Sequence, residues 1–155
     1  MIRNVQKDES TVKKGDILEI YTDGAARGNP GPAAYAYILV KDGNIIKQNS
    51  EFIGNTTNNT AEYHAIIHSL KETEKYTEWR IKIFSDSELV VRQINKEYRI
   101  KKAHLSQLCN DVYSLVQKFE KVEFFHVGRE NKFIKIADKL CNICLDRQFG
   151  RISKE

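Results

Sequence analysis

The stretch IYTDGAARGNPGPAAYAYILV, Ile20–Val40, holds two apolar runs separated by a carboxylate and a cluster of turn-forming residues. Ile17–Thr22 is rich in strand-forming residues, which predicts a first strand that ends on Asp23. The glycines that follow allow the backbone to turn tightly and to come close to a ligand. Ala33–Val40 is apolar again and predicts a second strand. We therefore expect a carboxylate at a strand end, beside a loop that can approach a ligand.

The rest of the chain alternates between strand-like and helix-like patterns. Lys41–Asn44 contains Asp-Gly between two apolar runs, which is typical of a hairpin and predicts a third strand over Ile45–Ile53. Further strands are predicted at Arg80–Ser85 and Val122–Val127, and helical stripes fall at Tyr63–Leu70, Leu89–Ile94, Leu105–Phe119 and Ala137–Leu145. This order predicts an α/β fold: a five-stranded mixed sheet whose first three strands are antiparallel, with helices on both faces.

Length and composition indicate a single packed domain. The chain has 155 residues, of which 41% are hydrophobic, and a net charge of +4. We expect a flexible polar leader over 1–15, one domain over 16–150 and a tail over 151–155. No signal peptide or membrane-length apolar run is evident, and the odd number of cysteines fits a reducing compartment, so we expect a cytoplasmic protein.

Four carboxylates stand out by their positions. Asp23 and Asp86 each follow a strand predicted to be parallel to the other, so both side chains should face the crevice at the carboxyl ends of those strands. Glu62 falls in the predicted first turn of one helix, and Asp138 in the first turns of the last helix. Each acid alone is as well explained by helix capping or turn formation. All four at one sheet edge indicate a functional site, in which mutual repulsion raises at least one pKa.

Four sequence blocks carry a family resemblance. TDGAARGNPGPAAYAYIL, TTNNTAEYHAI, FSDSELVVRQI and HVGRE…AD resemble, in order, the motif blocks of the type 1 ribonuclease H family, and the resemblance covers about Ile17–Leu145. It implies a ribonuclease H-like fold and hydrolysis of the RNA strand of RNA/DNA hybrids, leaving 3′-hydroxyl and 5′-phosphate ends. It also implies two Mg²⁺ ions, which Mn²⁺ can replace. Asp23 would bridge both ions, Asp138 would complete the site of the nucleophile-side ion, and Glu62 and Asp86 would hold the other.

The resemblance also implies contacts to nucleic acid. Asn29, Asn58 and Asn59, with Gly28 beside them, match positions that contact RNA 2′-hydroxyls, and Thr57 matches a DNA-phosphate contact. An amide can donate to and accept from a 2′-hydroxyl without a charge, although turn and capping chemistry is an alternative for each asparagine. Lys101 and Lys102 belong to a short basic segment where some members of the family carry a longer insertion. They would contact phosphates or form a solvated loop.

The loop before Asp138 departs from the family pattern. Many members carry a histidine in this loop, whereas here the loop reads VGRENKFIKIAD and His126 lies at the end of the preceding strand. Arg129 and Glu130 are the nearest polar candidates for a loop role, with Glu130 as the possible substitute for the histidine. Surface salt bridges are the alternative for both residues.

Two other functions remain open at this point. One is a metal-dependent nuclease of the same fold that cuts double-stranded RNA or branched DNA, and the other is a hybrid-binding module without catalysis. The asparagine set favours hybrids, and the presence of all four acids favours catalysis. We expect a monomer that binds RNA/DNA hybrid, with no organic cofactor and no membrane partner.

Overall fold

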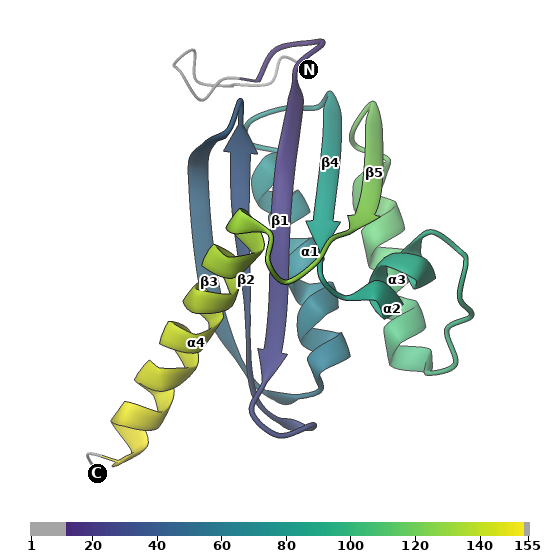
Figure 1. Cartoon of the computed structure of the whole chain (residues 1–155). Coiled ribbons are helices and arrows are strands. Elements are labelled where there is room, and N and C mark those ends of the chain that lie inside the picture. The colour runs from purple at the N-terminus through teal and green to yellow at the C-terminus, as the bar shows by residue number, and fades with distance from the viewer. Residues whose placement is uncertain (1–11, 154–155) are drawn as a thin grey trace.

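The computed structural model describes residues 12–153 and shows one five-stranded sheet with helices on both faces (Figure 1). The strands are β1 (Ile17–Ala26), β2 (Gly31–Lys41), β3 (Asn44–Thr56), β4 (Arg80–Ser85) and β5 (Lys121–His126). The helices are α1 (Asn58–Thr73), α2 (Glu88–Ile94), α3 (Ala103–Val116) and α4 (Lys132–Ser153). The strand order is β3-β2-β1-β4-β5, with β1 to β3 antiparallel and β4 and β5 parallel to β1. The predicted fold is confirmed.

The end of β1 differs from the prediction. The parallel pairing between β1 and β4 stops at Thr22 and Ser85, but β1 continues against β2, where Asp23 pairs with Ala36 and Ala26 with Ala33. Asp23 therefore lies within β1, at the point where its parallel neighbour ends. The prediction was wrong because it assigned the glycine after Asp23 to a turn, whereas the turn begins only at Arg27.

Gly24 lets a helix approach the sheet rather than bending the chain. A Cβ atom placed on Gly24 would overlap backbone atoms of Ala61 and Glu62 in α1. The absence of a side chain thus allows α1 to lie directly against β1. The turn itself uses Gly28, whose φ of +95° is in the left-handed region that glycine adopts readily.

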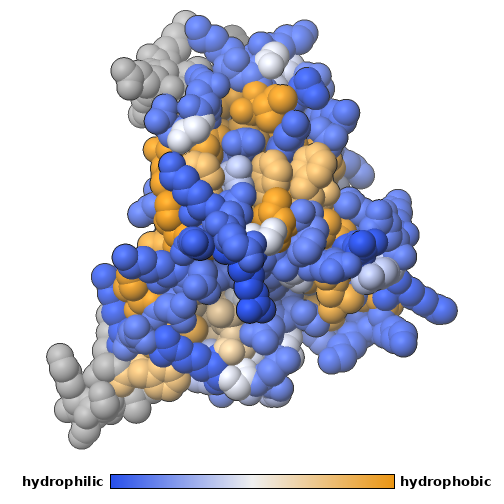
Figure 2. Space-filling model, in the orientation of Figure 1, coloured by the Kyte–Doolittle hydropathy of each residue, from blue (hydrophilic) through white to orange (hydrophobic). Residues whose placement is uncertain are grey.

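Two hydrophobic layers cover the two faces of the sheet. The larger layer lies between the sheet and helices α1 to α3, and the smaller lies beneath α4, which packs on β1, β2 and β3. On the α4 side, β4 and β5 carry Phe84 and Phe125, whose stacked rings extend from Tyr21. Figure 2 shows apolar side chains on this side of the molecule, above the connection that leads into α4.

The structured part of the chain extends past the expected domain limits at both ends. Val12, in the segment expected to be a leader, is 3% exposed and belongs to the larger core layer, whereas residues 1–11 lie outside the described part of the chain. At the other end, α4 extends to Ser153, into the segment expected to be a tail. No helix within residues 12–153 is both long and apolar enough to cross a membrane.

Candidate metal-dependent active site

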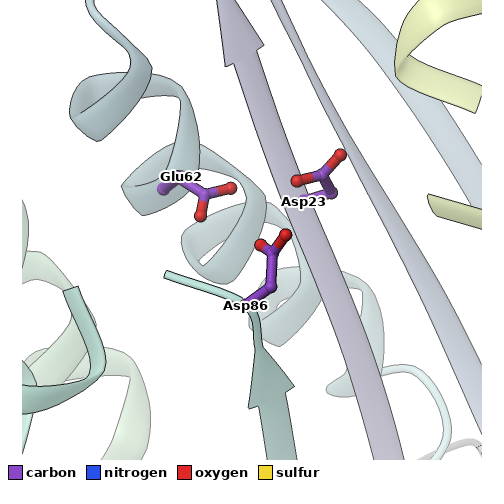
Figure 3. A group of neighbouring side chains, drawn as sticks. All are labelled: Asp23, Glu62 and Asp86. Carbon is purple, nitrogen blue, oxygen red and sulfur yellow. The ribbon is translucent and has the colours of Figure 1, made fainter. Parts of the chain in front are cut away.

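Three carboxylates meet at the carboxyl end of the parallel strands. Asp23 comes from the middle of the sheet, Glu62 from α1 and Asp86 from the residue directly after β4 (Figure 3). One oxygen of each side chain lies within 4.8 Å of the others. Asp23 and Glu62 are each 6% exposed, so two acids are almost completely buried in this group.

Local structure in α1 fixes the position of Glu62. Thr57 caps the helix, because its side-chain oxygen accepts a hydrogen bond from the N–H of Thr60 at 3.2 Å. Glu62 is the fifth helical residue, so it lies beyond the first turn in which it was predicted. Its position depends on a hydrogen bond from the Gly24 N–H to Oε1 rather than on the helix end.

Burial and mutual repulsion raise the pKa values of all three acids. Burial, followed by the charges of Asp86 and Asp138, raises the pKa of Asp23 to about 8. Burial and then the Asp23 charge raise the pKa of Glu62 well above its ordinary value. Burial also raises the pKa of Asp86, against the opposing effect of the nearby Arg129. Three ionised carboxylates are therefore unfavourable in this group unless protons or a cation reduce their negative charge.

Asp138 completes the acidic cleft. It lies in the second turn of α4, is exposed, and is close enough to raise the pKa of both Asp23 and Asp86. Together the four acids line a cleft of about 470 Å³. The structure thus brings together four side chains that are up to 115 positions apart in the sequence (138 minus 23).

The chemistry of this cleft fits a divalent cation. Asp23 Oδ2 is buried, yet it has no hydrogen-bond partner within residues 12–153. A buried carboxylate oxygen without a donor is costly unless a cation or a proton satisfies it. The surrounding ligand atoms are carboxylate oxygens, which hard ions such as Mg²⁺ prefer. The residues present therefore fit the metal that the sequence predicts.

The candidate RNA-contacting residues form a hydrogen-bonded rim beside the cleft. Asn58 Oδ1 accepts a bond from the Ala26 N–H at 2.7 Å, and Asn29 Oδ1 accepts one from the Asn58 N–H at 3.1 Å. Asn58 and Asn59 line the cleft, while Gly28 and Asn29 are exposed in the adjoining turn. The turn and capping hydrogen bonds considered as an alternative for these asparagines are thus present at Asn29 and Asn58. Each of these two side chains keeps its Nδ2 group as a donor for a ligand.

The candidate phosphate-contacting residues lie farther from the acids. Thr57 donates its hydroxyl to Thr60 Oγ1 at 2.9 Å, and Thr60 Oγ1 lies 3.4 Å from His104 Nε2. This contact brings the start of α3 next to the start of α1, although the exposed Lys101 and Lys102 do not line the cleft. The sequence had not singled out His104; its position two residues after a Lys-Lys pair could have drawn attention to it.

The loop before α4 contributes one of its two candidates to the cleft. Arg129 lines the cleft and acts electrostatically on Asp86, whereas Glu130 is exposed, does not line it, and has its carboxylate close to Gly128. Lys135 also lines the cleft and had not been predicted. Its place three residues before Asp138, on the same helical face, could have indicated it.

A sheet of order β3-β2-β1-β4-β5 with carboxylates at the ends of its parallel strands defines the ribonuclease H-like fold. Residues 21–144 match the family model described as "Reverse transcriptase-like". The chain belongs to the type 1 ribonuclease H family.

Three relatives illustrate the similarity. Ribonuclease HI of Halobacterium salinarum is 35% identical over 86% of this chain and 66% of its own length. Ribonuclease H of Campylobacter jejuni is 40% identical over 74% of this chain and 80% of its own. The crystal structure of LC11-RNase H1 in complex with RNA/DNA hybrid has a TM-score of 0.80 and 34% identity, and the match covers 85% of this chain and 99% of that one. The match covers just under two thirds of the Halobacterium relative's length. It also covers about a third of the length of a Mycobacterium tuberculosis relative called "Bifunctional protein Rv2228c", which is 31% identical over 82% of this chain.

Proposed function

We propose that this protein hydrolyses the RNA strand of RNA/DNA hybrids with two divalent metal ions, Mg²⁺ or Mn²⁺, and leaves 3′-hydroxyl and 5′-phosphate ends. The observation that carries the proposal is the convergence of Asp23, Glu62 and Asp86 within 4.8 Å, in a member of the type 1 family. The complex of the LC11 relative with RNA/DNA hybrid supports the choice of substrate.

The four acids would hold the two ions. Asp23 is central to the group, since it is nearest to the middle of the sheet and feels the charges of both Asp86 and Asp138. Ions held by these four acids would activate a water and neutralise charge on the leaving oxygen. The Gly24 N–H holds Glu62 in place, so this carboxylate needs little reorganisation when substrate arrives.

The rim residues would recognise the two strands. Asn29, Asn58 and Asn59 offer amide groups to 2′-hydroxyls, and Gly28 permits close approach of the RNA backbone. Thr57, Lys101 and Lys102 would contact phosphates of the DNA strand and its surroundings. Arg129 would place positive charge beside the scissile phosphate. Glu130, on the surface of the same loop, would take the part of the histidine that this loop lacks.

We further infer a cytoplasmic monomer. All three cysteines are free, which supports a reducing compartment. All four acids of the cleft come from the same chain, which supports a monomer. Elution as a monomer at assay concentration would agree with this inference, and a strict dependence of the specific rate on protein concentration would contradict it.

A cleavage assay tests the function. Labelled RNA/DNA hybrid, RNA duplex, DNA duplex and branched DNA are each incubated with Mg²⁺ and with Mn²⁺, and the product ends are mapped. We expect cutting of the RNA strand in the hybrid alone. Cleavage of another duplex with the hybrid intact would favour a different nuclease, and tight binding without cutting would favour a binding module.

Asp23→Asn provides the decisive variant. It should abolish cutting while hybrid binding is retained, because the change removes a metal ligand and adds no bulk. Asp111→Asn, which neutralises a carboxylate on α3 outside the cleft, is the matched control and should cut at the parent rate. Cleavage by Asp23→Asn at the parent rate would contradict the assignment.

A further inference from the structure

The first residue of the β1–β2 loop reaches across to the last helix. Arg27 follows β1 directly, and its N–H donates to the Pro32 carbonyl at 2.8 Å, which closes the turn. Its side chain leaves this turn and contacts α4, where Nη2 lies 2.6 Å from Asp146 Oδ1. The guanidinium also lies over the ring of Phe149, 5.3 Å from its centre. The substrate-side loop is thus fastened to α4 by one arginine.

A third contact of Arg27 leads toward the acidic cleft. Nη2 lies 3.3 Å from the carbonyl oxygen of Asn142 and 3.4 Å from its side-chain Oδ1. The other end of the same amide, Nδ2, donates to Asp138 Oδ2 at 3.4 Å. Asn142 therefore stands between Arg27 and the fourth carboxylate of the cleft.

The charged neighbours of Asn142 determine which way its side-chain amide is oriented. A guanidinium only donates hydrogen bonds, so the end of the Asn142 amide that faces Arg27 must be the acceptor, Oδ1. The donor end, Nδ2, is then turned toward Asp138, which as a carboxylate only accepts. The two charged neighbours therefore require the same orientation of the Asn142 amide.

Asp138 needs such support more than the other acids do. Asp23 and Glu62 are buried and held within packed elements, whereas Asp138 is exposed on α4. The hydrogen bond from Asn142 Nδ2 restricts the rotation of the Asp138 carboxylate. Groups that orient metal ligands in this way commonly matter as much as a ligand contact.

We propose that Arg27 and Asn142 are positioning residues that hold the Asp138 carboxylate in the orientation required for metal binding. This inference rests on the proposed two-ion function of the cleft. It also joins the loop that carries Gly28 and Asn29 to the fourth acid, so that a substrate contact and a metal ligand share one rigid support.

Titration of the metal-free protein with Mn²⁺ by calorimetry tests the proposal without an activity assay. We expect Asn142→Ala to weaken Mn²⁺ binding about tenfold, in the range seen when a residue that orients a metal ligand is lost. Gln107→Ala is the matched control, because Gln107 makes the same amide-to-carboxylate contact to Asp111 at 3.1 Å on α3. It should bind Mn²⁺ as the parent does.

Substitutions of Arg27 separate positioning from general stability. Arg27→Lys retains a positive charge that can pair with Asp146 and should bind Mn²⁺ within about twofold of the parent. Arg27→Gln removes that ion pair and the donor it holds against Asn142, so its loss should approach that of Asn142→Ala. Because Arg27 acts through Asn142, the double variant should be no weaker than Asn142→Ala alone. Both side chains are partly or fully exposed, and circular dichroism verifies that each variant is folded.

Two results would overturn the proposal: unchanged Mn²⁺ affinity in folded Asn142→Ala, or losses that simply add in the double variant. Hybrid cleavage kinetics provide a second measurement: Asn142→Ala should lower kcat and leave the KM for hybrid unchanged. If the parent protein fails to cut hybrid, the proposed function fails, but the Mn²⁺ comparison still decides whether Arg27 and Asn142 position Asp138.

Discussion

Glu62 Oε1 accepts a hydrogen bond from the backbone N–H of Gly24, the residue that follows Asp23 in β1. One acid is therefore held by the backbone next to another, and no side chain separates the helix from the strand. This contact explains how two carboxylates can remain close in a buried place. The same N–H lowers the pKa of Glu62 and partly offsets the effect of burial.

Gly24→Ala should damage both stability and activity. The added Cβ would overlap backbone atoms of Ala61 and Glu62, so α1 must move away from β1 and carry Glu62 with it. We expect a loss of about 1–3 kcal/mol in the free energy of unfolding, as for other overpacked sites, together with loss of hybrid cleavage. Urea unfolding and the cleavage assay measure the two effects.

Gly43→Ala is the control for that variant. Gly43 has a φ of +79° in the β2–β3 hairpin but open space around its Cβ position, far from the acids. It should lose about 1 kcal/mol through backbone strain while cleavage is unchanged. Equal loss of cleavage in both glycine variants would contradict the proposed role of Gly24.

The metal-free protein should become less stable as pH rises from about 4 to 8. The pKa of Asp23 is about 8 in the folded protein, against about 3.9 in an unfolded chain. Between these values the folded state binds more protons than the unfolded state, so the free energy of unfolding falls with rising pH. Glu62 and Asp86, whose pKa values are also raised, act in the same direction.

Asp23→Asn and added Mg²⁺ should each reduce that loss. The variant removes the buried charge and is expected to stabilise the metal-free protein by about 2–5 kcal/mol at pH 8, since each pKa unit corresponds to about 1.4 kcal/mol. Mg²⁺ at about 100 times its dissociation constant should stabilise the parent by about 2.7 kcal/mol. Chemical unfolding of the parent and of Asp23→Asn at pH 5 and pH 8, with chelator or Mg²⁺, measures these differences. A metal-free parent that gains stability as pH rises would contradict the expectation.

Asn58 and Asn59 should respond differently to alanine. Asn58 Oδ1 accepts a hydrogen bond from the Ala26 N–H, which Asn58→Ala would lose, so this variant should cost about 1 kcal/mol of stability and also weaken hybrid binding. Asn59→Ala should weaken hybrid binding with the melting temperature unchanged. Fluorescence anisotropy and thermal melts separate these effects, and equal destabilisation by both variants would count against the hydrogen-bonded rim.

If Lys101 and Lys102 contact phosphates, they should contribute to the salt dependence of hybrid affinity. If each neutralises one phosphate, changing both to glutamine reduces the slope of log affinity against log salt by about 2, with little change in cleavage-site choice. Lys118→Gln is the control and should leave the slope unchanged, because Lys118 lies just after α3, where it pairs with Glu74. An unaltered slope in the double variant would assign both lysines to a solvated loop.

The sequence predicted the elements and the acids but not the close contacts. Strand and helix patterns depend on local periodicity, and the four motif blocks placed Asp23, Glu62, Asp86 and Asp138 in one cleft. Gly24 was misassigned to a turn because its purpose, contact with a helix 37 positions later (61 minus 24), is not local. Lys135 and His104 have local signals, the first beside Asp138 on one helical face and the second after a Lys-Lys pair. These patterns are ordinary on a protein surface, and only the fold shows that Lys135 lines the cleft and that His104 lies next to Thr60.

The central place of β1 has a consequence for biosynthesis. This strand is made before the other four strands of the sheet, yet one of its two edges stays unpaired until Arg80–Ser85 has been made, because its partner on that side is β4. A nascent chain that ends before then exposes an open strand edge to other chains. Asp138 arrives later still, with α4, so an incomplete translation product that ends before α4 would lack the full set of acids.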